Sequence, residues 1–238
     1  MGRMSRIVVV VGLAGSALGL SKLDLAAAAI VAASLLDVLD GGMARLLGAH
    51  SKLGAELDSL SDMVSLGVAP AVLLYTWVMH DAGTFGWALI LLFCICCALR
   101  LARFNTALED KDRPRWSYRY FTGVPTPASA GVVMLPLVFS FNFGTEFFGH
   151  VVLNSAVIIF ISLMMVGRLP TYSLKGIRVP HRFVVPVMLG VCLLAACLVG
   201  SLWMTLSVIG VLYLASLPLS YLSYRRRSAA EAKTVAVE

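Results

Sequence analysis

The chain alternates long apolar stretches with short polar connectors. Apolar stretches occupy residues 7–20, 25–36, 63–79, 85–99, 128–143, 151–166, 183–199 and 202–221. Several approach or reach the ~20 residues that a helix needs to cross a bilayer, whereas strands of a membrane barrel would alternate polar and apolar residues. The pattern therefore predicts an all-α, polytopic transmembrane helical bundle of about eight helices, with six to seven as the alternative. A cleaved or partly inserted segment is the alternative for residues 7–20.

Composition supports a membrane protein that forms a single domain over residues 1–238. Hydrophobic residues make up 59% of the chain, charged residues only 13%, and the mean hydropathy is +0.88. If the helices alternate in direction, of the 19 Lys and Arg only Lys22 falls in a loop opposite the termini, which leaves 18 on the terminus side. The positive-inside rule makes that side cytoplasmic, and it predicts that the basic tail, residues 225–238, lies at the cytoplasmic headgroups. The net charge of +6 thus reflects topology, and nucleic acid is not an expected partner.

Carboxylates are concentrated in residues 35–62, although the whole chain has only 13 Asp and Glu. Residues 26–47 fit one helix, with Asp37 and Asp40 toward its cytoplasmic end, and a second helix runs from residue 54 through Asp58 and Asp62. At about 100° per residue, the first pair lies ~60° apart and the second ~40° apart, so each pair shares a helix face. A short connector folds the helices antiparallel and lets the pairs face each other.

Four clustered carboxylates repel one another and lose hydration at the membrane boundary, and a divalent cation compensates for both effects. Hard oxygen ligands suit Mg²⁺ or Mn²⁺, with Ca²⁺ as a further occupant, and four carboxylates can hold a two-ion site. Such a pair of ions clamps a transferring phosphorus in phosphoryl chemistry. The alternative is that the acids are solvated or paired with Arg45 and Lys52. Glu56 lies on another face of its helix and is interpreted as a surface charge.

The acidic region follows a pattern: Asp37-x2-Asp40-Gly41-x2-Ala44-Arg45-x8-Gly54-x3-Asp58-x3-Asp62. This pattern resembles the complete signature of the CDP-alcohol phosphotransferase family. Residues 59–71, 99–105 and 121–130 further resemble the phosphatidylserine synthase branch of that family. The last hundred residues resemble it only as hydrophobic helices.

The resemblance implies an integral membrane enzyme that displaces CMP from a CDP-linked substrate with an alcohol. For the branch, it implies that CDP-diacylglycerol and L-serine give phosphatidylserine and CMP. It further implies that the four aspartates bind two metal ions and that Asp62 is also the base that deprotonates the attacking hydroxyl. Gly41, Arg45 and Ser51 match positions that hold the CDP portion.

The chemistry of these residues fits a CDP-diacylglycerol site. Gly41 and Ala44 carry little or no side chain, so a nucleotide can approach the helix closely. Arg45 offers a planar fork of donors for the diphosphate, and Gly54 leaves room at the start of the second helix. We therefore expect the donor-binding set to be Gly41, Ala44, Arg45, Ser51 and Gly54.

Polar residues near the end of the fourth apolar stretch form a candidate serine site. Arg100, Arg103 and Asn105 lie where that helix reaches the cytoplasmic side. Serine carries a carboxylate that needs a cationic partner, and Arg103 is the main candidate for it. Ordinary positive-inside anchoring is the alternative for both arginines.

Other functions fit the same region. A sister transferase would use glycerol 3-phosphate or inositol phosphate as the acceptor, and these acceptors demand a stronger phosphate clamp. A divalent-cation carrier would use the aspartates as its transport site, but it leaves Gly41, Ala44, Arg45 and Gly54 without a role. The expected partners are CDP-diacylglycerol, L-serine and membrane lipids, with a second copy of the chain as a further candidate.

Overall fold

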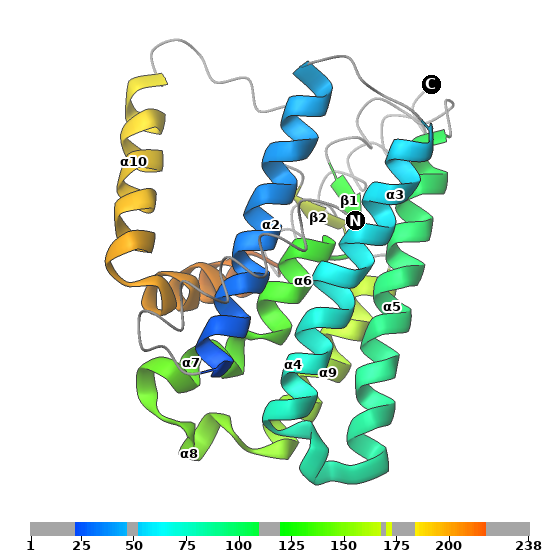
Figure 1. Cartoon of the computed structure of the whole chain (residues 1–238), viewed down its shortest axis with the longest axis vertical. Coiled ribbons are helices and arrows are strands. Elements are labelled where there is room, and N and C mark those ends of the chain that lie inside the picture. Colours follow the sequence, from blue (N-terminus) through cyan, green and yellow to red (C-terminus); the bar gives the residue numbers. More distant parts are fainter. Residues whose placement is uncertain (1–21, 47–51, 110–119, 168–169, 173–183, 218–238) are drawn as a thin grey trace, which may run out of the picture.

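The computed structural model describes residues 22–46, 52–109, 120–167, 170–172 and 184–217, and it is almost entirely helical (Figure 1). The predicted all-α class is confirmed, because each of the seven apolar stretches after residue 20 is helical over most of its described residues. The stretch at residues 7–20 lies outside the described residues. In chain order the helices are α2 (Lys22–Leu46), α3 (Lys52–Asp62), η1 (Met63–Val68), α4 (Ala69–Trp77), η2 (Met79–Ala82), α5 (Gly83–Glu109), α6 (Thr126–Val133), α7 (Leu135–Phe143), α8 (Thr145–Phe148), α9 (Val151–Val166), α10 (Val184–Gly200) and Leu202–Leu217.

Two of these helical segments are long and apolar enough to cross a membrane. They are Glu56–Trp77 and Met79–Thr106, and a third span results if α6 and α7, bent by 41°, are counted together. The bend has a cause in the sequence, since Pro136 lies in the first turn of α7 and lacks the N–H that would continue the α6 ladder. Shorter apolar helices occupy Val151–Val166, Val185–Gly200 and Leu202–Leu217. The chain is therefore an integral membrane protein.

The long helices run antiparallel in the order that the sequence predicts. Figure 1 shows α2 and α5 rising to the end of the bundle at which α3 and α10 begin. The connectors near residues 50, 110 and 175 lie outside the described residues, but the helix ends that flank them, those of α2, α3, α5 and α10, lie at this one end, as the predicted alternation requires. Because α2 ends and α3 begins at this end, it also holds the acidic region.

The core of the bundle lies between α5, α9 and the helices that flank them. Phe93 on α5, Leu137 on α7 and Ile158 on α9 are almost fully buried in one hydrophobic cluster. Gly67 permits a close approach of η1 to α5, because a Cβ there would lie 3.0 Å from the Sγ atom of Cys97. The packing of α5 therefore fixes where its C-terminal polar residues lie relative to α3.

A short antiparallel ribbon, which the sequence did not reveal, joins the segments before α6 and after α9. Strands β1 (Tyr120–Thr122) and β2 (Pro170–Tyr172) pair with Phe121 opposite Thr171. Gly123 follows β1 with a φ of +82°, and a Cβ there would lie 2.7 Å from the carbonyl oxygen of Met165. Only glycine fits this turn without strain.

The helix Leu202–Leu217 differs from a simple alternation of spans, because it lies across the other helices (Figure 1). Its polar and aromatic side chains explain this position. Asn142 on α7 donates a hydrogen bond from Nδ2 to Ser207 Oγ over 3.1 Å, and the rings of Phe141 and Trp203 pack 4.7 Å apart. These contacts hold the helix against α7.

Candidate active site

The predicted aspartates lie on the C-terminal part of α2 and on α3. These two segments lie at the same end of the bundle and run antiparallel (Figure 1). Helix α2 packs against η1 and α4, the segments that continue from Asp62. The backbone of α2 is helical through Asp37 and Asp40, as the spacing predicts, but their side chains lie outside the described residues. That the two pairs face each other stays a prediction.

Asp58 and Asp62 lie one turn apart on α3, which confirms their shared helix face. Asp58 is exposed, whereas Asp62 is half-buried and its Oδ1 atom is fully buried. Glu56 is exposed, in agreement with its interpretation as a surface charge. The second carboxylate pair thus extends from the solvent-accessible surface into the bundle.

A π-helical segment, η1, begins directly after Asp62. Such segments are rare and often occur at functional sites, because the wider turn changes the direction in which side chains point. Here the segment also contains Gly67, where α5 approaches closely through Cys97. Arg100 follows Cys97 by about one helical turn, so the same packing brings its side chain toward Asp62.

Within the described part of this site, Arg100 is a buried cation. Only 9% of the residue is exposed, its Nη1 atom donates a hydrogen bond to Thr126 Oγ1 over 2.5 Å, and its guanidinium lies 5.6 Å from the centre of the Phe104 ring. It also lies within electrostatic range of the Asp62 carboxylate and of the Tyr213 hydroxyl. A buried guanidinium needs an anionic or hydrogen-bonding environment, and the carboxylate of Asp62 contributes to it.

The other two predicted serine-binding residues make contacts between helices. Arg103 is exposed, and its Nη1 atom donates a hydrogen bond over 2.6 Å to the carbonyl oxygen of Val166, the last residue of α9. Asn105 donates from Nδ2 to Ser59 Oγ over 2.9 Å, which ties α5 to α3 beside Asp58. A serine-binding role for either residue stays a prediction.

The predicted donor-binding residues are only partly described. Gly54 is exposed in the first turn of α3, as room for a ligand requires. The side chains of Ala44 and Arg45, and the position of Ser51, lie outside the described residues, and Gly41 is placed only through the backbone of α2.

The described part of the site is compatible with a divalent cation. Asp58 and Asp62 supply hard oxygen donors one turn apart, and one of these oxygens is buried. Among the side chains that are described, no group of three or more His, Cys, Asp and Glu comes together. A full ligand set would therefore need Asp37 and Asp40 from α2.

Two residues of the site had little or no signal in the sequence. Thr126 lies within residues 121–130, which resemble the family, but its role as the acceptor for Arg100 depends on the packing of α6 against α5. Tyr213 lies in the C-terminal third, where the sequence shows only hydrophobic helices. Its electrostatic interaction with Arg100 arises because the last helix lies across the bundle.

The fold and the site define a class: integral membrane proteins that carry a carboxylate-rich site at one end of a helical bundle. Comparison with protein families narrows this class. The CDP-alcohol phosphatidyltransferase model matches residues 3–166, and the related CDP-alcohol phosphatidyltransferase 2 model matches residues 182–218. The chain therefore belongs to the CDP-alcohol phosphatidyltransferase family.

Three curated relatives that the chain resembles carry the same name. The chain is 36% identical over 193 residues to the CDP-diacylglycerol–serine O-phosphatidyltransferase of Mycobacterium leprae, covering 81% of this chain and 64% of that protein. It is 34% identical over 200 residues to the protein of that name from Mycobacterium bovis, covering 84% of this chain and 70% of the relative. A Methanocaldococcus jannaschii protein of the same name is 37% identical over 143 residues, or 59% of this chain and 61% of that protein.

Proposed function

We propose that the chain acts as a CDP-diacylglycerol–serine O-phosphatidyltransferase in phospholipid biosynthesis. One observation carries the proposal: relatives with this name are 34–36% identical over 81–84% of the chain. The electrostatic interaction between the buried Arg100 and the half-buried Asp62 supports it, because the acceptor serine needs both a base for its hydroxyl and a partner for its carboxylate.

In the proposed reaction, the serine hydroxyl oxygen attacks the β-phosphorus of CDP-diacylglycerol, the phosphorus that bears the diacylglycerol. The bond from this phosphorus to the oxygen shared with CMP breaks, and CMP leaves with that oxygen and its electron pair. The products are phosphatidylserine and CMP. The hydroxyl proton passes to the carboxylate of Asp62.

Asp62 suits the role of general base because it is half-buried, while Asp58 on the same face is exposed. A base at the inner end of the site can meet an acceptor that is shielded from water, and such catalysis typically contributes 10²–10⁴-fold to the rate. We assign Asp37, Asp40, Asp58 and Asp62 to a site for two Mg²⁺ or Mn²⁺ ions. When bound, such ions would polarise the diphosphate and offset its negative charge.

We assign the serine carboxylate to Arg100 rather than to Arg103. Arg100 is buried and interacts with Asp62, so a ligand held by its guanidinium can place a hydroxyl near the base. Arg103 already donates to the end of α9. Arg45 is the corresponding candidate for the diphosphate, together with the close approach that Gly41, Ala44, Ser51 and Gly54 permit.

We place the protein in the cytoplasmic membrane, with both termini and the site facing the cytoplasm. The support is the charge distribution, since 18 of 19 Lys and Arg lie on the terminus side of the alternating topology. The acidic ends of α2 and α3 lie at the same end of the bundle as the C-terminal end of α5 and the start of α10 (Figure 1).

Competition between acceptors tests the proposed function. Purified chain in detergent micelles would receive CDP-diacylglycerol, Mn²⁺ and equal concentrations of labelled L-serine, glycerol 3-phosphate and inositol phosphate. We expect thin-layer chromatography to show phosphatidylserine as the main lipid product. A main product from glycerol 3-phosphate or inositol phosphate would identify a sister transferase, and metal flux into liposomes that lack CDP-lipid would support a carrier.

A further inference from the structure

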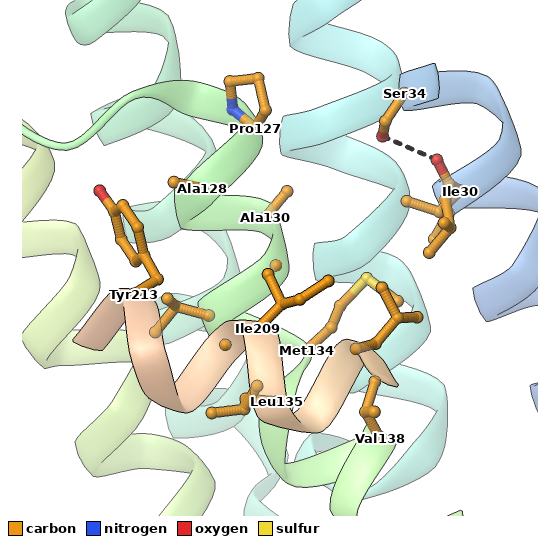
Figure 2. A pocket seen from close by; sticks show the side chains of 15 residues that line it. Ile30, Ser34, Pro127, Ala128, Ala130, Met134, Leu135, Val138, Ile209 and Tyr213 are labelled. Carbon is orange, nitrogen blue, oxygen red and sulfur yellow. Dashed lines mark hydrogen bonds between the residues drawn. The ribbon is translucent and has the colours of Figure 1, made fainter. Parts of the chain in front are cut away.

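An apolar cavity of about 280 Å³ lies between α2, α6, α7 and the helix Leu202–Leu217 (Figure 2). Its lining is almost wholly hydrocarbon, with Ile30 on α2, Met134 and Val138 at the bend of α6 and α7, and Ile209 on the last helix. Clefts that hold drug-sized ligands measure ~300–1,000 Å³. The cavity therefore has room for a single hydrocarbon chain rather than for a whole lipid.

Tyr213 marks a polar end of this cavity. Two polar side chains line the cavity, and one of them, Ser34, donates its hydroxyl hydrogen bond to the carbonyl oxygen of Ile30 over 2.8 Å. The Oη atom of Tyr213 is buried and has no hydrogen-bond partner among the described residues. A buried hydroxyl in this state is costly, so it indicates a ligand atom or a water that completes the site.

The polar end of the cavity lies near Arg100 of the candidate active site. Figure 2 shows the Tyr213 hydroxyl at the level of Ala128, near the start of α6. Arg100 is bound to Thr126 at this end of α6, and it interacts electrostatically with both Tyr213 and Asp62. A ligand that extends from the charged site past Tyr213 would thus enter a hydrocarbon-lined space.

From the proximity of Tyr213 to Arg100, and resting on the proposed function, we infer that the cavity holds one acyl chain of the CDP-diacylglycerol donor, while the Tyr213 hydroxyl donates a hydrogen bond to an ester or phosphate oxygen of the same lipid. The donor combines a charged headgroup with hydrocarbon tails. The charged site suits the headgroup, and the apolar cavity beside it suits a tail. The last helix then helps to select the donor, because it forms one wall of the cavity.

Gly131 offers a direct way to fill the cavity. It lines the cavity from α6, and a Cβ added there meets no atom within 4 Å. A leucine at this position would therefore occupy the space without forcing the backbone. Gly190 on α10 is a matched control, since it is exposed in a helix and its added Cβ also meets nothing within 4 Å. It does not line the cavity.

The first experiment locates the chain without relying on turnover. Full-length protein would be irradiated with a CDP-diacylglycerol that carries a diazirine within one acyl chain, and the labelled peptides would be identified by mass spectrometry. We expect labels on residues 127–138 or 206–213, suppressed by excess unlabelled CDP-diacylglycerol and retained in excess phosphatidylglycerol. Labels confined to other helices, or equal suppression by phosphatidylglycerol, would overturn the inference.

The second experiment measures donor preference by steady-state kinetics with CDP-diacylglycerols that carry long and short acyl chains. Because an acyl chain forced against an inserted side chain resembles overpacking of a core, we expect Gly131→Leu to raise the KM for the long-chain donor roughly 5- to 150-fold. Gly190→Leu should leave it unchanged. Equal KM changes in Gly131→Leu for both donors, or none for either, would contradict the assigned chain.

The hydroxyl has its own test. Tyr213→Phe removes only the Oη atom, so we expect the KM for the donor to rise roughly 2- to 12-fold, the effect of one neutral hydrogen bond, with the KM for serine unchanged. Tyr75→Phe, on α4 against Trp87, is the control. An unchanged donor KM in Tyr213→Phe would remove the hydroxyl from the site. If wild-type protein makes no phosphatidylserine, the proposed function fails, whereas the labelling experiment still decides whether the cavity binds the lipid.

Discussion

Replacement of Arg100 by glutamine tests the assignment of the serine carboxylate. The residue is 9% exposed, and one of its N–H groups already donates to Thr126. The guanidinium has five N–H donors, so further donors remain for a carboxylate. Loss of a charge-assisted hydrogen bond costs about 1.5–3 kcal/mol, which corresponds to a rise of roughly 10- to 150-fold in the KM for serine.

The assay is a pair of substrate titrations in detergent micelles, after size-exclusion chromatography has shown that the variant is folded. We expect the KM for CDP-diacylglycerol to change by less than about threefold in Arg100→Gln, because the lost bond of about 1.5–3 kcal/mol serves the acceptor. Arg103→Gln is the matched control one turn along the same helix. It loses the bond to Val166 and should lose only about 1 kcal/mol of stability, with little change in either KM.

Thr126→Val tests whether the position of the Arg100 guanidinium matters when its charge is kept. This variant keeps Arg100 but removes the oxygen that accepts its hydrogen bond. A neutral bond is worth about 1 kcal/mol, so the KM for serine should rise only about fivefold. The assignment of the serine carboxylate to Arg100 is wrong if Arg100→Gln raises the KM for the donor as much as the KM for serine, since Arg100 would then bind the diphosphate. The assignment is also wrong if Arg103→Gln raises the KM for serine and Arg100→Gln does not.

Three further outcomes are expected. Asp62→Asn should lower turnover by about 10²–10⁴-fold while donor binding, measured by titration calorimetry, is largely retained; equal loss of both would make Asp62 mainly a metal ligand. Chelation by excess EDTA should abolish activity and added Mg²⁺ or Mn²⁺ should restore it, whereas full turnover in samples shown to be metal-free would exclude the two-ion site. Gly123→Ala should lower the free energy of unfolding by about 1–3 kcal/mol, because the φ of +82° and the nearby Met165 carbonyl oppose a side chain. Thermal unfolding, with Gly190→Ala as the control, would measure this loss. An unchanged Tm in Gly123→Ala would contradict it.

Apolar runs located most of the helices correctly because membrane-spanning helices are marked by length and hydropathy alone. The stretch at residues 151–166 coincides with α9, and the helix expected at 26–47 is observed at Lys22–Leu46. The β1–β2 ribbon and the four-residue helix α8 were missed, since segments of three or four residues are too short to show a period. The position of the last helix depends on contacts such as Asn142 to Ser207, which link residues far apart in the chain.

The sequence placed Asp58 and Asp62 on one helix face, as observed, but it favoured Arg103 over Arg100 as the serine-binding residue, and the structure buries Arg100. Helix α5 is apolar on all sides, so its hydrophobic pattern does not reveal which face is buried. In the structure the buried face follows Phe93, Cys97 and Arg100, at helical spacing. Arg103, about one turn further along α5, is exposed. Only the packing of η1 and α6 against α5 distinguishes the two.

Measurement of CMP and phosphatidylserine in one reaction is the most direct test of whether the chain transfers a phosphatidyl group to serine. Purified chain would be incubated with CDP-diacylglycerol, Mn²⁺ and labelled L-serine, and CMP and labelled lipid would be quantified over time. We expect CMP and phosphatidylserine to form in equal amounts, both only when serine is present, and both to nearly vanish in Asp62→Asn. Release of CMP without incorporation of serine into lipid, or incorporation that persists in Asp62→Asn, would contradict it.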